Sequence, residues 1–333
     1  MISKREFCTL KDGRKVNCYR IENKQEEYVE LLDYGASVQS VVVKDKEGRW
    51  GDVVLGADPD RLEECTYLGG TIGRCANRIA YGKYTVDNQE FQLEQNMRGH
   101  FLHGASGNYA QKLFTGTIDE EKNGVNFFYR DKGEGGFCCC VDVNFFFSFD
   151  DEGKLTMEFR MKTEGTTVLN PTNHTYFNLS GKQDVRADHS LWIDTNVLVT
   201  KGKDGLPDGG TVRVEGFPYD FTTEHRLSEA MTVEGYDEFY EIDGETFKHI
   251  ATLTCPDNGR TMKVYSDMPC LILFLNGKRK PEYGKNGAKY EGYCGICLET
   301  GYVPNAVNCP AYRQPVFRAG EELVTKTVYE FLC

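Results

Sequence analysis

VDVNFFFSFDDEGKLTMEFRMK, residues 141–162, contains two runs in which apolar and polar side chains alternate. The apolar positions are Val141, Val143, Phe145, Phe147 and Phe149 in the first run and Leu155, Met157, Phe159 and Met161 in the second. A period of two places every second side chain on the same face of a strand, so each run predicts a strand with one buried face. The DDEG stretch at 150–153 is typical of a hairpin turn. The two runs therefore predict adjacent antiparallel strands.

The same signals recur along the chain. Similar pairs of runs flank DKEG at 45–48, DNQE at 87–90 and PDNG at 256–259. The only helical segments expected are short connectors, around Asp58–Tyr67 and Thr222–Met231. Because strands follow strands without crossover helices, we expect an all-β fold in which antiparallel sheets stack as a large sandwich.

No domain boundary is visible between these strands. Two segments rich in glycine and lysine, 201–210 and 277–287, are expected to be surface loops rather than linkers. All-β sandwiches often exceed the usual domain size, and 40% of the 333 residues are hydrophobic. We therefore expect one domain over residues 1–333.

Composition limits the class of partner and the compartment. A formal charge of −12 argues against nucleic acid, which is bound by clustered Lys and Arg. No apolar run approaches the length of a membrane helix, and the first residues lead into no apolar signal segment. Thirteen cysteines, an odd number that includes CCC at 138–140, suit a reducing compartment better than a disulfide framework. We expect a cytoplasmic protein that contacts neither membrane nor nucleic acid.

VLNPTNHTYFNLSG, residues 168–181, sets His174 among amide and hydroxyl side chains that are unsuited to a core strand. These amide and hydroxyl side chains belong to Asn170, Thr172, Asn173, Thr175 and Asn178. They supply the donors and acceptors needed to fix the tautomer of an imidazole and to bind a polyhydroxylated ligand. The segment indicates a sugar site; the alternative is a histidine satisfied by hydrogen bonds in a polar turn.

Three further segments carry side chains suited to the same ligand. In GRCANRIA at 73–80, Asn77 and Arg78 place an amide beside a forked cation that can bind neighbouring hydroxyls; the alternative is a solvated loop. In FLHG at 101–104, His103 precedes Gly104, where a ligand can approach the backbone. In CLET at 297–300, Glu299 lies at the end of an apolar strand, where a raised pKa can make a base; the alternative is a solvated glutamate.

Other chemistries find less support. The CGIC stretch at 294–297 has zinc or redox spacing, but in an extended strand its two sulfurs would point to opposite faces. No second such pair and no histidine pair at metal spacing follows, so we expect no metal. A serine hydrolase would need a glycine-flanked nucleophile, which is absent from the sequence.

Together the segments resemble the aldose 1-epimerase (galactose mutarotase) family over nearly the whole chain. The matching motifs are LDYGA at 32–36, residues 73–80, LHG at 102–104, residues 170–181, GYD at 235–237, LET at 298–300 and PNAVN at 304–308. NPTNHTYFNL at 170–179 with a later LET is the most specific combination. The resemblance implies a β-supersandwich, a small-molecule sugar as partner and no cofactor.

The resemblance also implies a role for six residues. Glu299 resembles the general base and His174 the general acid of the family, His103 is similar to a second histidine on the sugar, and Asn77, Arg78 and Asp237 are similar to its hydroxyl-binding residues. Exchange of α and β anomers removes a proton from the C1 hydroxyl while the ring oxygen gains one, so acid and base are expected on opposite sides of the hemiacetal.

The sequence departs from the family pattern around the sugar. Gly301 and Ile272 stand where many members have glutamine, and GNYAQK at 107–112 replaces a Gly-Phe-Asp-Lys. These departures concern the choice of sugar and spare the acid and base. Two alternatives remain: a sugar-binding protein without turnover, and an epimerase of sugar phosphates whose basic residues would be Arg78 and the KRK stretch at 278–280.

Overall fold

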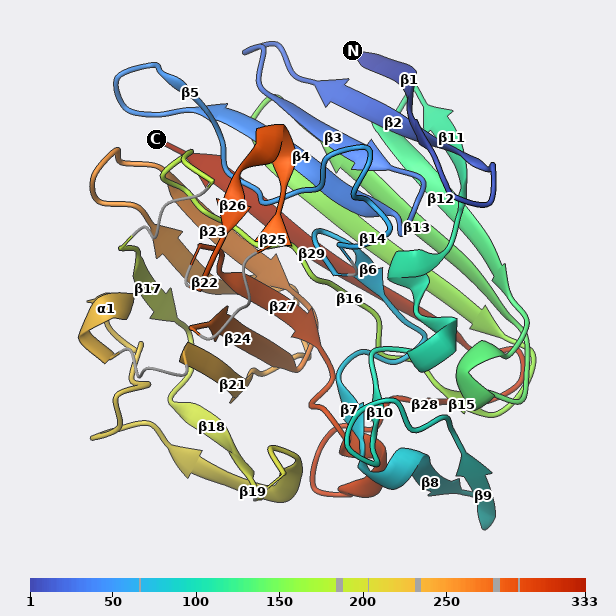
Figure 1. The fold of residues 1–333 in the computed structure, drawn as a ribbon. Helices are drawn as coiled ribbons and strands as arrows, with labels where there is room; N and C mark the ends of the chain where they lie inside the picture. Colours follow the sequence, from blue (N-terminus) through green and yellow to red (C-terminus); the bar gives the residue numbers. More distant parts are fainter. Residues whose placement is uncertain (66, 184–187, 203, 231–234, 278–281, 293) are drawn as a thin grey trace.

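The computed structural model describes residues 1–65, 67–183, 188–202, 204–230, 235–277, 282–292 and 294–333. Strands dominate this part of the chain (Figure 1), and every pairing between named strands in it is antiparallel. Among the described residues there is one α-helix, the single turn α1 (Leu227–Ala230). The predicted all-β class with antiparallel sheets is confirmed.

A nine-stranded sheet forms one layer of the molecule. In spatial order it contains β11 (Thr115–Asp119), β12 (Gly124–Asp131), β13 (Val141–Phe149), β14 (Lys154–Thr163), β29 (Glu322–Leu332), β23 (Thr261–Ser266), β22 (Lys248–Thr254), β17 (Ser190–Ile193) and β20 (His225–Arg226). The hairpin expected at 141–162 is β13 and β14, with Phe145 opposite Phe159. Burial alternates along β13, so the period-two pattern correctly marked its buried face.

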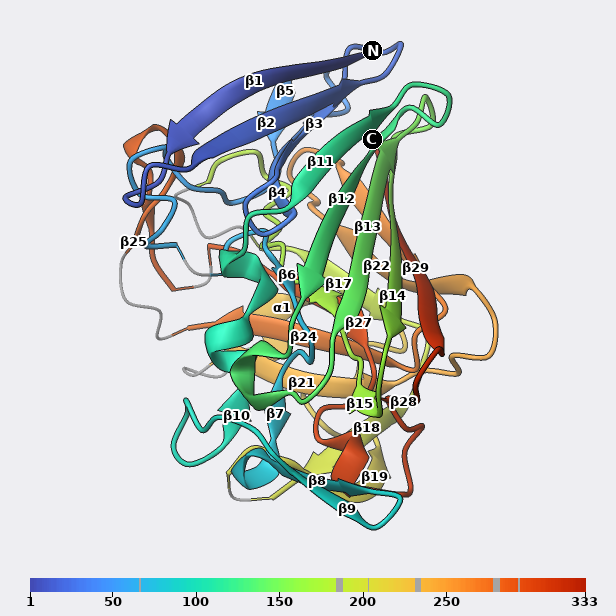
Figure 2. The same ribbon diagram turned by 90° about the vertical axis from the view of Figure 1, so that its right-hand side faces the viewer.

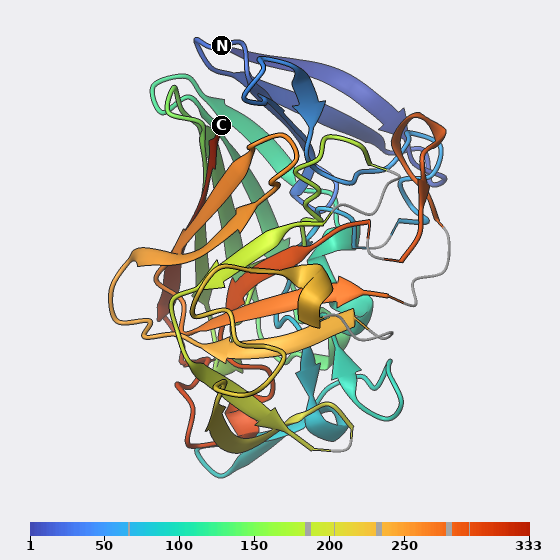
Figure 3. The ribbon, with the colours of Figure 1, turned by 90° about the vertical axis from the view of Figure 1, so that its left-hand side faces the viewer.

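Two five-stranded sheets cover the same face of this layer (Figures 2 and 3). The N-terminal one contains β1 (Ile2–Thr9), β2 (Lys15–Glu22), β3 (Tyr28–Leu32), β4 (Ser37–Lys44) and β5 (Trp50–Asp52) in order. The other contains β19 (Pro207–Arg213), β18 (Val197–Lys201), β21 (Gly235–Glu241), β24 (Cys270–Asn276) and β27 (Cys297–Gly301). We call this second sheet the β18–β27 sheet, and its strand β27 contains Glu299, the predicted base.

Short two-stranded pairs carry most of the loops that contain the motifs. They are β6 (Thr71–Ile72) with β16 (Thr172–Asn173), β7 (Arg78–Ile79) with β10 (Phe101–Leu102), β8 (Lys83–Val86) with β9 (Gln89–Gln92), β15 (Thr167–Val168) with β28 (Val316–Phe317), and β25 (Glu282–Tyr283) with β26 (Lys289–Tyr290). The turns predicted at 45–48, 87–90 and 256–259 join β4 to β5, β8 to β9 and β22 to β23. Pairing therefore places the loops 73–80, 101–104 and 168–181 in the same region.

The main apolar core joins all three large sheets. Its members include Val29 of β3, Phe145 of β13 and Leu273 of β24, all fully buried. The layers also share a hydrogen bond, since the Tyr329 hydroxyl of β29 donates to the Leu298 carbonyl of β27 at 2.8 Å. Burial of large side chains between sheets is the main term that holds such layers together.

Some sequence predictions about connectors are wrong. The segment 58–67 forms hydrogen-bonded turns rather than a helix at its described residues, with the Arg61 N–H donating to the Asp58 carbonyl at 3.0 Å. Segment 201–210 is largely the β18–β19 hairpin, and β25 begins within 277–287, where residues 278–281 lie outside the described chain. In both segments the strands of a local hairpin extend into a stretch whose composition indicated only a loop. α1 does fall within the second predicted connector. No helix among the described residues is long and apolar enough to cross a membrane.

Candidate active site

Glu299 lies in β27 at the edge of the β18–β27 sheet. In its pairing with β24, Glu299 is opposite Ile272 and Cys297 is opposite Phe274. Alternation along a strand puts residues 297, 299 and 301 on one face, and directly opposite residues point to the same side. Glu299 is only 3% exposed, although the sequence alone equally allowed a solvated glutamate.

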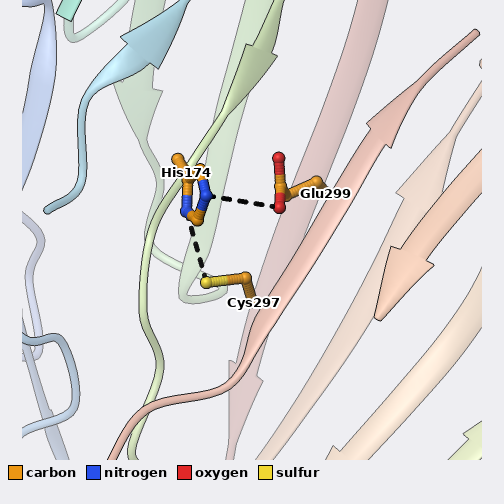
Figure 4. A group of neighbouring side chains, drawn as sticks. All are labelled: His174, Cys297 and Glu299. Carbon is orange, nitrogen blue, oxygen red and sulfur yellow. Dashed lines mark hydrogen bonds and ion pairs between the residues drawn. The ribbon is translucent and has the colours of Figure 1, made fainter. Parts of the chain in front are cut away.

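His174 follows β16 and faces Glu299 from another element. The pairing of β16 with β6 fixes its backbone: its N–H donates to the Gly70 carbonyl at 2.9 Å. Figure 4 shows the imidazole between two side chains of β27. Its Nε2 lies 3.6 Å from Glu299 Oε1, and its Nδ1 lies 3.4 Å from Cys297 Sγ. Both ring nitrogens therefore have a partner that orients the ring.

Aromatic rings surround this imidazole. Tyr176 and Tyr67 lie nearly parallel to it, with centroids 4.9 and 5.8 Å away, and Phe274 meets it edge-on at 5.8 Å. Stacking of this kind restricts the rotation of the ring and excludes water from it. Sequence analysis missed these three residues; the position of Tyr176, two residues after His174, is the one local signal that pointed to the site.

Burial sets the proton affinity of Glu299. Desolvation, and then the charge of Asp237, raise the pKa of the Glu299 carboxyl to about 8. Its Oε2 atom is buried and has no hydrogen-bond partner among the described residues. A carboxyl group in such a place can exchange protons near neutral pH, and one of its oxygens stays available as a hydrogen-bond acceptor.

His103 lies beside His174, with ring centroids 5.6 Å apart. The backbone N–H of Asn77 donates to His103 Nδ1 at 3.1 Å, so in the neutral ring the proton is on Nε2. Burial, followed by the neighbouring His174 and Arg78, lowers the pKa of His103 well below its ordinary value. His103 is therefore a neutral donor through Nε2–H.

Arg78 and Asp237 form the more open side of the group. Arg78 Nη1 lies 3.6 Å from Asp237 Oδ2, and their side chains are 24% and 40% exposed. Asn77 Oδ1 accepts a hydrogen bond from the Arg78 N–H at 2.8 Å. All six residues selected from the sequence therefore lie in one chain of neighbours, from Glu299 and His174 through His103 and Asn77 to Arg78 and Asp237.

The asparagines of segment 168–181 form hydrogen bonds with backbone groups of other segments within the described chain. The Tyr302 N–H donates to Asn170 Oδ1 at 2.8 Å, while the Asn173 and Asn178 amides donate to the carbonyls of Gly69 and Cys294, each at 2.9 Å. They tie the loop to distant backbone groups and thereby place His174. Gly104 likewise serves the fold, since a Cβ there would meet the Gly73 carbonyl oxygen at 2.1 Å.

Arg74, the other arginine of the 73–80 segment, is structural. Its side chain is 1% exposed, and its Nε donates to Asp131 Oδ2 at 2.8 Å. Tyr109 donates to the same carboxylate oxygen at 2.7 Å, and Thr167 and the Cys139 carbonyl accept from the guanidinium. A fully paired buried ion pair holds this loop to β12, away from Glu299.

Potential metal ligands do converge, although the sequence indicated none. One ligand atom each from His174, Cys297 and Glu299 can be chosen so that all three lie within 4.8 Å of one another. Spacing rules missed this group because Cys297 and His174 are 123 residues apart. No disulfide joins any of the thirteen cysteines, all of which lie within the described residues.

Comparison with known proteins agrees with the fold and the motifs. The family model described as Aldose 1-epimerase matches residues 17–330. The human galactose mutarotase is 33% identical over 315 residues, which cover 91% of this chain and 90% of that protein. The aldose 1-epimerase of Escherichia coli K12 is 26% identical, with 96% of each chain covered. A crystal structure of galactose 1-epimerase from Lactobacillus acidophilus superposes with a TM-score of 0.86 at 24% identity, covering 100% of this chain and 98% of that one. The chain belongs to the aldose 1-epimerase family.

Proposed function

We propose that this chain is an aldose 1-epimerase that interconverts the α and β anomers of free aldoses. The family match over residues 17–330 supports a single catalytic domain over residues 1–333. The odd number of cysteines, with three consecutive ones at 138–140, supports a reducing compartment, the cytoplasm. The charge of −12 leaves a neutral sugar, rather than nucleic acid, as the partner.

In the proposed reaction, the ionised Glu299 takes the proton of the C1 hydroxyl while His174 gives a proton to the ring oxygen. The C1–O5 bond breaks and leaves an open aldehyde. Rotation about the C1–C2 bond turns the other face of the carbonyl to the C5 hydroxyl, and ring closure returns both protons with the roles reversed. No group is consumed, so the enzyme needs no co-reactant.

The observation that carries this proposal is the buried pair itself. His174 Nε2 and Glu299 Oε1 are 3.6 Å apart, and O1 and O5 of a hemiacetal are bonded to the same carbon. Two adjacent side chains can therefore each reach one of the reacting oxygens, a more compact arrangement than groups on opposite sides. A protein that only bound sugar would have no need of a buried base with a pKa near 8.

Four further residues would bind the hydroxyls. His103 offers its Nε2–H, Asn77 its amide, Arg78 a cation and Asp237 an acceptor, which together suit a polyol. The reading as a sugar-phosphate epimerase depended on Lys278, Arg279 and Lys280, which lie outside the described residues.

Polarimetry tests the proposal. Freshly dissolved α-D-galactose or α-D-glucose should reach its equilibrium rotation faster with the protein than without it. The Glu299→Gln variant at equal concentration is the control for non-specific catalysis by protein side chains. If wild-type protein gave no acceleration with any aldose, the chain would be a sugar-binding member without turnover.

A further inference from the structure

We propose that His174, Cys297 and Glu299 form a binding site for a thiophilic divalent cation such as Zn²⁺, and that an ion held there blocks the sugar site. Cys297 has no part in the proposed reaction. It lies two residues before Glu299, on the same face of β27, and its Sγ is 3.4 Å from His174 Nδ1. The thiol is therefore the extra group that turns an acid and base pair into a three-ligand set (Figure 4).

The donor types fit this class of ion. Zinc is bound by cysteine sulfur, histidine nitrogen and carboxylate oxygen, and sites with three protein ligands keep a fourth position open for water or another ligand. A thiolate disfavours Mg²⁺ and Ca²⁺, which prefer oxygen ligands only. All three groups are buried, and Glu299 Oε2 has no hydrogen-bond partner among the described residues. The set thus includes an oxygen that no group of the described chain satisfies.

The three side chains lie close enough to form a tetrahedral site after one of them moves. Zinc bonds of about 2.0–2.3 Å place neighbouring ligand atoms roughly 3.3–3.7 Å apart. The contacts of 3.4 Å and 3.6 Å fall in this range, but they involve different nitrogens of His174. One ion can bind only one of the two nitrogens of His174. The ligand atom that faces the other nitrogen lies within 4.8 Å of the remaining two ligand atoms and must move by about 1 Å. Rotation of the cysteine or glutamate side chain supplies this movement.

An ion at this place would occupy both reacting groups. Glu299 could not accept a proton while it ligates the metal, and the open coordination position would face the space where the sugar binds. Inhibition should therefore be competitive with the sugar. This consequence depends on the proposed function, whereas metal binding itself does not.

Cobalt binding tests the site without any measurement of activity. Co²⁺ replaces Zn²⁺ in such sites and gives a thiolate-to-cobalt charge-transfer band in the near ultraviolet. We expect one equivalent of Co²⁺ to produce this band in the wild type and in Cys270→Ser, whose buried cysteine lies on the neighbouring β24 opposite Gly301, outside the ligand group. The band should be absent from Cys297→Ser. A band that survives in Cys297→Ser, or no stoichiometric binding to the wild type, would overturn the proposal.

A second measurement uses the wild type alone and so does not depend on the folding of a variant. Rising galactose concentration should weaken Co²⁺ binding in proportion to sugar occupancy, and Zn²⁺ should raise the apparent KM of mutarotation without lowering kcat. The Zn²⁺ concentration that halves the rate of Cys297→Ser, measured against the metal-free rate of that variant, should be at least about tenfold higher than for the wild type. The reason is that loss of even an outer-shell partner lowers metal affinity by about 10–100-fold. Stoichiometric binding of Co²⁺ by a protein that does not accelerate mutarotation would refute the proposed function alone. Mutarotation that neither Co²⁺ nor Zn²⁺ affects would refute the metal site alone.

Discussion

At the scale of single residues, the site depends on groups that have little meaning alone. His174 and Glu299 are ordinary in type, and their burial together in a ring of aromatic side chains gives them their chemistry. Cys297 touches the imidazole from the other side and fixes its orientation. The first two predictions concern residues that separate catalysis from folding.

Removal of the acid or the base should abolish most turnover and leave the fold intact. Glu299→Gln and His174→Asn should each lower kcat by about 10²–10⁴, the usual contribution of a general acid or base. Polarimetry measures the rate, and circular dichroism measures folding. Glu158→Gln and His249→Asn, on the nine-stranded sheet, are matched controls that should keep full activity. Near wild-type mutarotation in either site variant, with the fold preserved, would remove that residue from the mechanism.

Loss of Arg74 should lower the stability of the fold. Arg74→Met leaves the Asp131 carboxylate buried without its counter-ion, which costs about 3–5 kcal/mol of unfolding free energy. Urea unfolding measures this loss. Arg160→Met is the control, because Arg160 and its partner Glu322 are 4.0 Å apart and largely exposed. Equal stability of the two variants would show that the ion pair does not hold the loop.

At the scale of elements, β24 sets the character of the wall beside the base. Ile272 is 3% exposed, lies opposite Phe239 on one side and Glu299 on the other, and packs in an apolar cluster. Gly301 adds no side chain, and a Cβ there would meet Asn170 Oδ1 at 2.8 Å. Asn170 is held by Tyr302, so Gly301 packs against a fixed amide, whereas Ile272 belongs to a packed, apolar wall.

This wall should favour sugars with less polar surface. We expect kcat/KM for fucose, which lacks the C6 hydroxyl, to equal or exceed that for galactose, because an apolar wall offers no partner to a desolvated hydroxyl. Ile272→Gln should raise kcat/KM for galactose relative to kcat/KM for fucose by roughly tenfold, which corresponds to about 1.4 kcal/mol of discrimination. Ile272→Leu keeps the volume and should leave the ratio unchanged. A wild-type preference for galactose of more than about 10²-fold would contradict an apolar wall.

At the scale of the whole molecule, the shared core should make the sheets unfold together. The chain has two tryptophans: Trp50 in β5 of the N-terminal sheet and Trp192 in β17 of the nine-stranded sheet. In the Trp192→Phe variant the remaining Trp50 reports on the N-terminal sheet. In the Trp50→Phe variant the remaining Trp192 reports on the nine-stranded sheet. Their guanidinium unfolding curves should coincide, since coincident probes mark a single cooperative transition. An earlier transition at Trp50 would instead show that the N-terminal sheet is a separate unit.

Local sequence was sufficient for the strands, the hairpins and the family. The alternation at 141–149 and 155–161 requires only the spacing of neighbouring residues, and the turn at 150–153 follows from residue types. The motif around His174 and the LET at 298–300 selected residues that the fold does bring together. Local composition did not locate the ends of the strands around a turn, as in the β18–β19 hairpin, whose strands extend into segment 201–210.

Tertiary structure alone decided the environment of the site. The contact of Cys297 with His174 spans 123 residues, and the hydrogen bonds between Asn170 and Tyr302 span 132. The raised pKa of Glu299 arises from its burial and from the charge of Asp237 on β21. Such effects depend on which side chains share a space, a property of the packed layers that spacing along the chain does not encode. The sequence by itself determined the strands, the family and the residues that we propose to carry the chemistry, and only the packing decided their environment, orientation and neighbours.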